Sequence, residues 1–162
     1  MSSLFNHAFI PIAILLIFSG VLKLNPRNII ILSFFGMLPD LDIFLFHRES
    51  LHNIFILIIP IMVLIITKNR EISGIITFYL ASHIILDIFN GGIYLLYPFY
   101  DNVVFARTEI FFDKIPLFDI GISNNIVSMK KVGESIISSE NIATTILLMI
   151  VTAVSIIKKY KF

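Results

Sequence analysis

The sequence predicts an all-α integral membrane protein, a helical bundle of about four to five transmembrane helices with an extracytoplasmic insert. Of 162 residues, 57% are hydrophobic and only 14% are charged, whereas a soluble domain has about 45–50% and about 25%. The apolar residues also fall into long runs, and the basic residues gather just after three of these runs. We therefore expect residues 1–162 to form a single membrane domain.

The helices are expected at five apolar segments. A hydrocarbon core about 30 Å thick takes roughly 20 helical residues, and all five segments are shorter or interrupted, which indicates a thinned bilayer or a partly hydrated outer half. One of them, 28–46, is interrupted by Pro39 and two aspartates. The uninterrupted segments are 8–22, 54–66, 72–89 and 142–157.

The basic residues predict the orientation, because Lys and Arg favour the cytoplasmic side of a membrane. If the segment ends that carry them are cytoplasmic, the N-terminus lies outside and the C-terminus is cytoplasmic. The five segments then alternate in direction across the membrane, and every basic cluster stays on the cytoplasmic side. We accordingly expect a multi-pass protein of the cell (inner) membrane. The basic residues in question are Lys23, Arg27, Lys68, Arg70, Lys158, Lys159 and Lys161.

In this orientation residues 91–140 lie outside the membrane. The insert is too long for a structureless loop in a compact domain. Three tyrosines near its start, Tyr94, Tyr97 and Tyr100, suit an interfacial belt or a lid over the bundle. Residues 103–112 (VVFARTEIFF) could form a strand or an amphipathic helix.

Composition also limits the chemistry of a functional site. The chain has no cysteine, so disulfides and thiolate metal sites are excluded, and imidazole and carboxylate remain as the strong ligands. The formal net charge of +1 implies no general attraction to nucleic acid.

Four potential metal ligands occur within GMLPDLDIFLFHRESLHNIF, residues 36–55, between apolar runs. They are Asp40, Asp42, His47 and His52. A second group lies in the segment 72–89, where His83 and Asp87 are four residues apart. Such a pair shares one helical face, with Cβ atoms about 5–6 Å apart, which is close enough to share an ion.

The depth of these residues in the membrane suggests that they form one site. Heights can be counted from the cytoplasmic end of each segment, at a rise of about 1.5 Å per residue. His7 then lies about 24 Å above that end of its segment, Asp40 about 18 Å, His52 about 24 Å and Asp87 about 23 Å. All four histidines and three aspartates thus fall in the outer half.

Each of these residues has a simpler interpretation when it is taken alone. A single histidine in an apolar helix is usually a hydrogen-bonded packing residue, a His83–Asp87 pair can be an interhelical clamp or part of a proton relay, and Pro39 with Asp40 can be a kink and a cap. Seven ionisable side chains at one depth nevertheless need a common neutralising partner, because charge in a bilayer is costly. A divalent cation supplies it.

These motifs resemble a known family. GMLPDLD, then HRESLH, then HIILD followed by NGG and LLYPF is similar to the YdjM-like family of inner-membrane metal-dependent hydrolases, over the chain from His7 to about Phe99. That family is in turn similar to the zinc-dependent phospholipases C and the S1/P1 nucleases. The chain departs from the family pattern between Arg48 and His52, where Glu49, Ser50 and Leu51 stand in place of a favoured Gly and Thr.

The resemblance implies one or two divalent ions, zinc above all. Asp40, one of His47 and His52, His83 and Asp87 would hold the first, and His7 would reach a second ion beside a bridging Asp87. No histidine follows Asp87, so the three-zinc site of the soluble relatives would be incomplete.

We expect a membrane-embedded hydrolase of phosphate esters in lipids or lipid-linked substrates, with a metal-activated water. Asp42 is the expected base, with Asp40 as the alternative if it is not a ligand. Arg48 suits a phosphate oxygen through its bidentate guanidinium, or it snorkels to the membrane surface. The alternatives are a divalent-metal transporter or sensor, which the apolar cytoplasmic halves of the segments disfavour, and an inactive interaction subunit with a structural metal.

Overall fold

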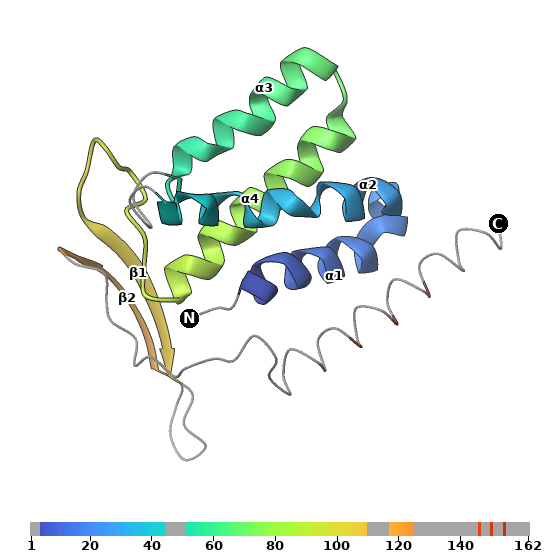
Figure 1. Ribbon diagram of the computed structural model, residues 1–162. Helices are drawn as coiled ribbons and strands as arrows, with labels where there is room; N and C mark the ends of the chain where they lie inside the picture. Colours follow the sequence, from blue (N-terminus) through green and yellow to red (C-terminus); the bar gives the residue numbers. More distant parts are fainter. Residues whose placement is uncertain are drawn as a thin grey trace.

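The computed structural model describes residues 4–44, 51–109 and 117–124, together with the isolated helical positions Ile146, Ile150 and Val154. Helices account for most of this part, and four of them are α-helices (Figure 1). They are α1 (Leu4–Leu22), α2 (Pro26–Ile31), α3 (Ile58–Thr67) and α4 (Arg70–Phe89). Three 3-10 helices join them, η1 (Leu32–Met37), η2 (Pro39–Phe44) and η3 (Ile54–Leu57), and two strands follow, β1 (Val103–Glu109) and β2 (Leu117–Ser123).

Helix α4 is the centre of the fold, and it contacts α1, α2, α3, η1, η3 and β1. One side of it packs Ile75 and Tyr79 against Leu16 of α1 and Ile29 of α2. The other side packs a second cluster of buried residues, Ile56, Ile76, Leu80, Ile84 and Ile93. The fully buried Tyr79 hydroxyl donates a hydrogen bond of 2.7 Å to the Ile29 carbonyl, so the α2 turn is held by both packing and polar contact.

The turns that precede α2 and α4 are built alike. Asn25 and Asn69 cap the two helices. The Asn25 side chain accepts from Arg27 N, and that of Asn69 accepts from Glu71 N and Ile72 N. Lys23 and Lys68, just before them, adopt positive φ angles of 54° and 57°. Glu71 then ties the turns together, because its Oε1 accepts from Asn25 N at 2.7 Å and from Asn28 Nδ2 at 3.1 Å.

The interrupted segment 28–46 is not a continuous helix. Its α-helical part ends at Ile31, and η1 and η2 follow, separated by Leu38. Pro39, at the start of η2, has no N–H to donate and therefore breaks the ladder. Irregular backbone at membrane depth is tolerated only against protein or water, and η1 contacts both α1 and α4.

Among the described residues, α4 alone is long and apolar enough to cross a membrane, whereas the apolar stretches His7–Leu22 and Ile54–Thr67 are shorter. The expected span 142–157 lies outside the described residues except for three exposed positions, Ile146, Ile150 and Val154. The helical character of the fold is thus confirmed, and four to five transmembrane passes stay a prediction.

The insert contains a small sheet, which the all-α prediction did not include, although a strand was one of the two alternatives left open for residues 103–112. Strands β1 and β2 pair antiparallel, with Val103 opposite Ser123 and Glu109 opposite Leu117. The physical reason is the run of β-branched and aromatic residues Val103, Val104 and Phe105, which favour a pleated surface. Gly121 leaves room for the Phe105 ring, since a Cβ there would lie 2.9 Å from Phe105 Cζ.

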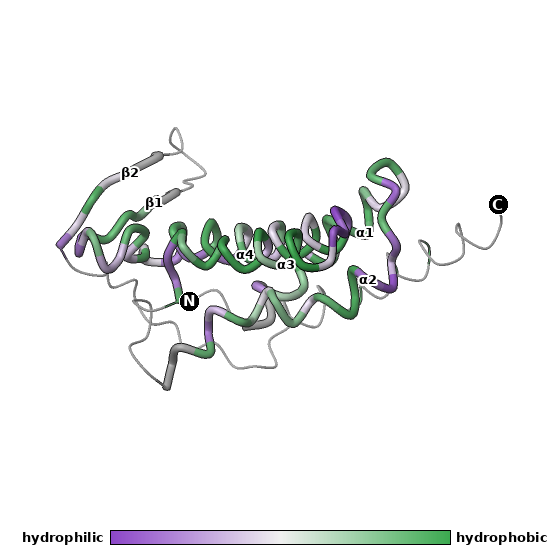
Figure 2. Tube along the Cα trace, turned by 90° about the horizontal axis from the view of Figure 1, so that it is seen from above, coloured by the Kyte–Doolittle hydropathy of each residue, from purple (hydrophilic) through white to green (hydrophobic). Residues whose placement is uncertain are grey.

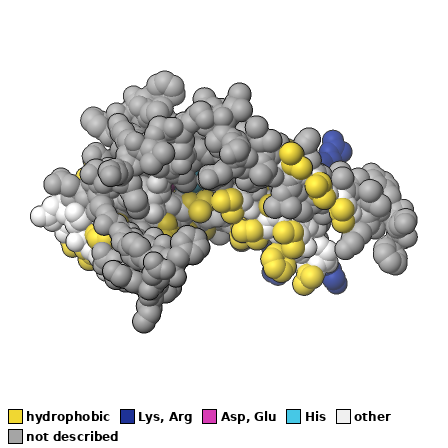
Figure 3. Space-filling model, turned by 90° about the horizontal axis from the view of Figure 1, so that it is seen from below, with side chains coloured by type: hydrophobic (Ala, Val, Ile, Leu, Met, Phe, Trp, Pro, Cys, Tyr) yellow, Lys and Arg dark blue, Asp and Glu magenta, His cyan; other side chains and the backbone are white. Residues whose placement is uncertain are grey.

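Large apolar side chains are exposed on the outer faces of the helices. They include Ile17, Phe18 and Val21 of α1 and Ile61, Ile65 and Ile66 of α3. Figure 2 shows hydrophobic positions along α1, α3 and α4, with hydrophilic positions in the connecting segments. Figure 3 shows hydrophobic side chains gathered on one face, with Lys and Arg near one end of the molecule. Such an extended apolar surface is typical of contact with lipid or a partner.

Candidate metal centre

Five of the predicted ligands converge at one point from four separate segments. His7 comes from α1, Asp40 from η2, His52 from the residues before η3, and His83 and Asp87 from α4. Figure 1 shows why this is possible, because the start of α1 lies near the end of α4. The end of α1 that carries His7 and the end of α4 that carries His83 and Asp87 are therefore neighbours in space.

The site is buried. His7, His52, His83 and Asp87 have at most 2% of their surface exposed. The side chain of Asp40 is 21% exposed, which makes it the most accessible of the five. Ionisable groups at such depth need a charge partner, and here they serve as partners for one another.

Four atoms form the centre of the cluster. His52 Nε2 lies 3.1 Å from His83 Nε2 and 3.1 Å from Asp87 Oδ2. His83 Nε2 lies 3.4 Å from the same Asp87 oxygen. Asp40 Oδ1 lies 3.5 Å from His52 Nε2 and 3.7 Å from His83 Nε2. A tetrahedral ion bound at about 2.0–2.2 Å holds its ligand atoms roughly 3.3–3.6 Å apart, and these five distances, between 3.1 and 3.7 Å, lie close to that range.

The other carboxylate oxygen of Asp87 faces the remaining histidine. Asp87 Oδ1 lies 3.3 Å from His7 Nε2, and the ring of His7 stacks on that of His83 with centroids 4.1 Å apart. His7, His83 and Asp87 form a second group whose ligand atoms lie within 4.8 Å of one another. Asp87 thus links both groups.

Local structure explains how each side chain is aimed. The i, i+4 spacing in α4 places His83 and Asp87 on one helical face. Next to His52, Asn53 caps η3 by accepting from Phe55 N at 3.0 Å, and Ile54 N donates to Leu95 O at 2.9 Å. These two contacts fix the segment that carries His52 against the chain beyond α4.

The protonation of His83 follows from one further contact. Its Nδ1 lies 2.7 Å from the carbonyl oxygen of Gly36. A carbonyl only accepts, so Nδ1 carries the proton and donates it. In the neutral ring, Nε2 then presents its lone pair to His52, Asp40 and Asp87, as a metal ligand does.

The donor set fits a metal ion such as zinc. It consists of imidazoles and carboxylates only, which is a donor set that zinc accepts. Asp40 Oδ2 is buried and has no hydrogen-bond partner within the described part of the chain, a costly arrangement that an additional cation would relieve. The same contacts also act as buried ion pairs. These groups could therefore hold a metal ion, and they also join four segments directly.

Not every predicted residue can be placed. Asp42 lies in η2, but its side chain, and the whole of His47 and Arg48, fall outside the described residues. Of the two candidate histidines, His52 lies in the cluster, and His47 is not among the described residues. Sequence reasoning missed Gly36, whose carbonyl orients His83; the signal that could have found it is Pro39, three residues later.

Comparisons with known proteins give one family. The family model described as YdjM inner membrane protein matches residues 1–162. No curated protein and no solved structure shows a significant match.

Proposed function

Since the chain belongs to the YdjM family of inner-membrane proteins, we propose that it is a membrane-embedded, metal-dependent hydrolase. The observation that carries this proposal is the convergence of the buried His52, His83 and Asp87 with the partly exposed Asp40, whose ligand atoms lie 3.1–3.7 Å from one or both histidine Nε2 atoms. These residues hold one divalent ion, most simply zinc. His7 and Asp87 Oδ1 belong to a second, adjacent position.

The bound ion would supply Lewis acidity, which polarises a scissile ester and lowers the pKa of a water molecule to roughly 7. The roles of the other residues rest on the sequence. Asp42 accepts the proton of the attacking water, and Arg48 binds two oxygens of the phosphoryl group through its planar guanidinium. Burial of the site keeps bulk water away from these charges and strengthens their interaction.

The proposed substrate is a phosphate ester of a lipid or a lipid-linked molecule. Two observations support this class. Asp40 is the most exposed of the five side chains, and its neighbours Met37 and Leu41 are apolar and 40% and 60% exposed. A substrate that reaches Asp40 therefore passes along an apolar surface.

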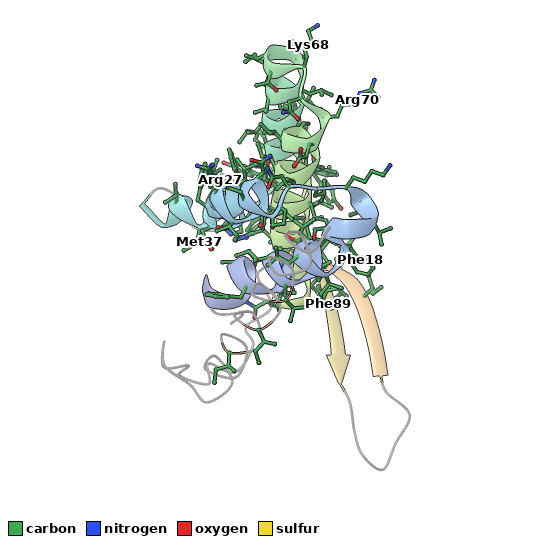
Figure 4. All side chains as sticks on the ribbon, turned by 90° about the vertical axis from the view of Figure 1, so that its right-hand side faces the viewer. Phe18, Arg27, Met37, Lys68, Arg70 and Phe89 are labelled. Atoms are coloured by element: carbon green, nitrogen blue, oxygen red, sulfur yellow. The ribbon has the colours of Figure 1, made fainter. Side chains whose placement is uncertain are left out.

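We place the site on the extracytoplasmic side, with the N-terminus outside and the C-terminus cytoplasmic. Figure 4 shows Lys68 and Arg70 at one end of the α3–α4 pair and Phe89 at the other end of α4. His83 and Asp87 lie near Phe89. The positive-inside rule puts the basic end in the cytoplasm, which supports this placement.

A transport role is less well supported. An ion that crossed the bundle would need polar groups between the cluster and the basic end. The side chains buried between α1 and α4 are mostly apolar, including Leu15, Leu16 and Ile75. Ser19 and Ser73 bond to backbone carbonyls, and the Tyr79 hydroxyl is already bonded to Ile29.

The test is activity in reconstituted vesicles loaded with zinc, with mixed phospholipids as the probe. We expect phosphate or headgroup release that chelator abolishes. Arg48→Ala should keep the metal and lose on the order of 10²–10³ in rate, as for other contacts that stabilise developing charge, and Arg48→Lys should recover only part of it. The alternative outcome is zinc flux across the same vesicles with no ester cleavage. If that flux were also unchanged in Arg48→Ala, the transport function would be favoured instead.

A further inference from the structure

Gly36 contacts two of the histidines at once, although it carries no side chain. It is buried in η1, and a Cβ built there would lie 3.0 Å from the backbone oxygen of His7 and 3.4 Å from Tyr79 Cδ1. Its own carbonyl accepts the 2.7 Å hydrogen bond from His83 Nδ1. A small residue at this position therefore lets α1, η1 and α4 approach one another closely at the cluster.

Pro39 explains why this carbonyl is available. In a 3-10 helix each N–H donates to the carbonyl three residues earlier. Leu38 N donates to Phe35 O at 3.3 Å, and Leu41 N donates to Leu38 O at 3.1 Å. The bond in between, from residue 39 to Gly36, cannot form because proline has no N–H. The Gly36 carbonyl accepts the hydrogen bond from His83 Nδ1 instead.

We infer that Gly36 and Pro39 are positioning residues for the metal centre. Together they hold His83 in the tautomer with the proton on Nδ1, so that Nε2 is aimed at His52 and the two carboxylates. This inference rests on the proposed function for its metal, but not for the hydrogen bond itself. The inference also explains why the helix in the segment 28–46 is interrupted at Pro39: the interruption leaves the Gly36 carbonyl free to accept from His83.

The first experiment compares glycine variants. Gly36→Ala should push apart the backbones of η1 and α1 and misplace the carbonyl. Loss of such an outer-shell contact typically weakens metal binding by about 10- to 100-fold, and we expect this fall in zinc affinity in a competition titration. Gly20→Ala and Gly74→Ala are matched controls, because a Cβ at either position meets no atom within 4 Å. If all three variants bound zinc equally well, the inference would be overturned.

A second experiment reads the tautomer directly. In metal-free protein with ¹⁵N-labelled histidine, NMR should show the His83 proton on Nδ1, assigned by comparison with His83→Gln. Pro39→Ala restores an N–H that competes for the Gly36 carbonyl, so it should increase the population with the proton on Nε2. A wild-type His83 with its proton on Nε2 would contradict the inference.

The two experiments separate the inference from the function on which it rests. If the wild type bound no zinc, the proposed function would fail, while the tautomer in the metal-free protein would still decide the role of Gly36 and Pro39. If zinc bound normally and the tautomer were the opposite one, the positioning role alone would fail.

Discussion

The Nε2 atom of His52 lies 3.1 Å from Asp87 Oδ2, and the same carboxylate lies 3.4 Å from His83 Nε2 and 3.3 Å from His7 Nε2. One aspartate near the end of α4 thus contacts three imidazoles from three different segments. Because this buried carboxylate has three partners, both metal binding and the packing around the C-terminal end of α4 depend on it.

Replacement of Asp87 should therefore affect both properties. Asp87→Asn keeps the shape but removes the negative charge, and we expect zinc affinity to fall by more than the 10- to 100-fold typical of an outer-shell contact. The metal-free protein should also unfold at lower temperature, because three buried imidazoles lose the carboxylate that they contact. Competition titration and thermal unfolding in detergent measure the two effects. Asp101→Asn is the control, since Asp101 is exposed, and it should change neither; equal zinc affinity in both variants would contradict the assignment of Asp87.

The Glu71 clamp should act on stability alone. Glu71→Ala removes the acceptor for Asn25 N and Asn28 Nδ2, and we expect a loss of about 1–3 kcal/mol in the free energy of unfolding. Asn28→Ala removes one of these two bonds and should cost less. Zinc affinity should stay unchanged in both variants, because Glu71 lies about 18 Å along α4 from His83 at 1.5 Å per residue. A matching fall in zinc affinity would show that the two ends of α4 are coupled.

The orientation can be tested with single cysteines, because the chain has none of its own. Asn69 and Asn124 are both exposed. Asn124→Cys should react with an impermeant thiol reagent added to intact cells, whereas Asn69→Cys should react only after the membrane is opened. Labelling of Asn69→Cys from outside would reverse the topology and place the site near the cytoplasm.

The segment after α4 should lie at the outer interface of the bilayer. Phe99 is 83% exposed and makes a ring contact with Phe55, whose side chain is also exposed. The chain has no tryptophan, so Phe99→Trp and Ile14→Trp give single probes, Ile14 being exposed near the middle of α1. Aromatic residues gather at the interface, and we expect shallow brominated lipids to quench Trp at 99 and deep ones to quench Trp at 14. Equal quenching at both depths would contradict this arrangement.

The sequence predicted the cluster better than it predicted the backbone around it. The His83–Asp87 pair follows from helical periodicity, and a common depth grouped these residues with His7, Asp40 and His52. Depth is a single coordinate, however, and it could not separate His52 from His47, which stands close to it in the chain. The place of His52 in the cluster depends on the docking of the adjacent η3, whose Ile54 N donates to Leu95 O, and His47 lies outside the described residues.

The backbone of η1 and β1 was harder to predict for a different reason. The 3-10 geometry near Gly36 is completed by a hydrogen bond from His83, a residue far along the chain, so no local pattern contains it. In residues 103–112 the β-branched residues favour a strand, but what selects it is pairing with β2 and the bridge between Val104 and Ile93. Tertiary partners decided both cases.

The most direct test of the metal centre is the metal content of the purified protein after loading with zinc and dialysis. We expect one or two zinc ions per chain in the wild type, a lower melting temperature after chelation, and loss of most bound zinc in His83→Ala, with Asp101→Asn as the unaffected control. Wild-type protein that retains no zinc, or His83→Ala with the full wild-type content, would contradict the assignment of this cluster as a metal site.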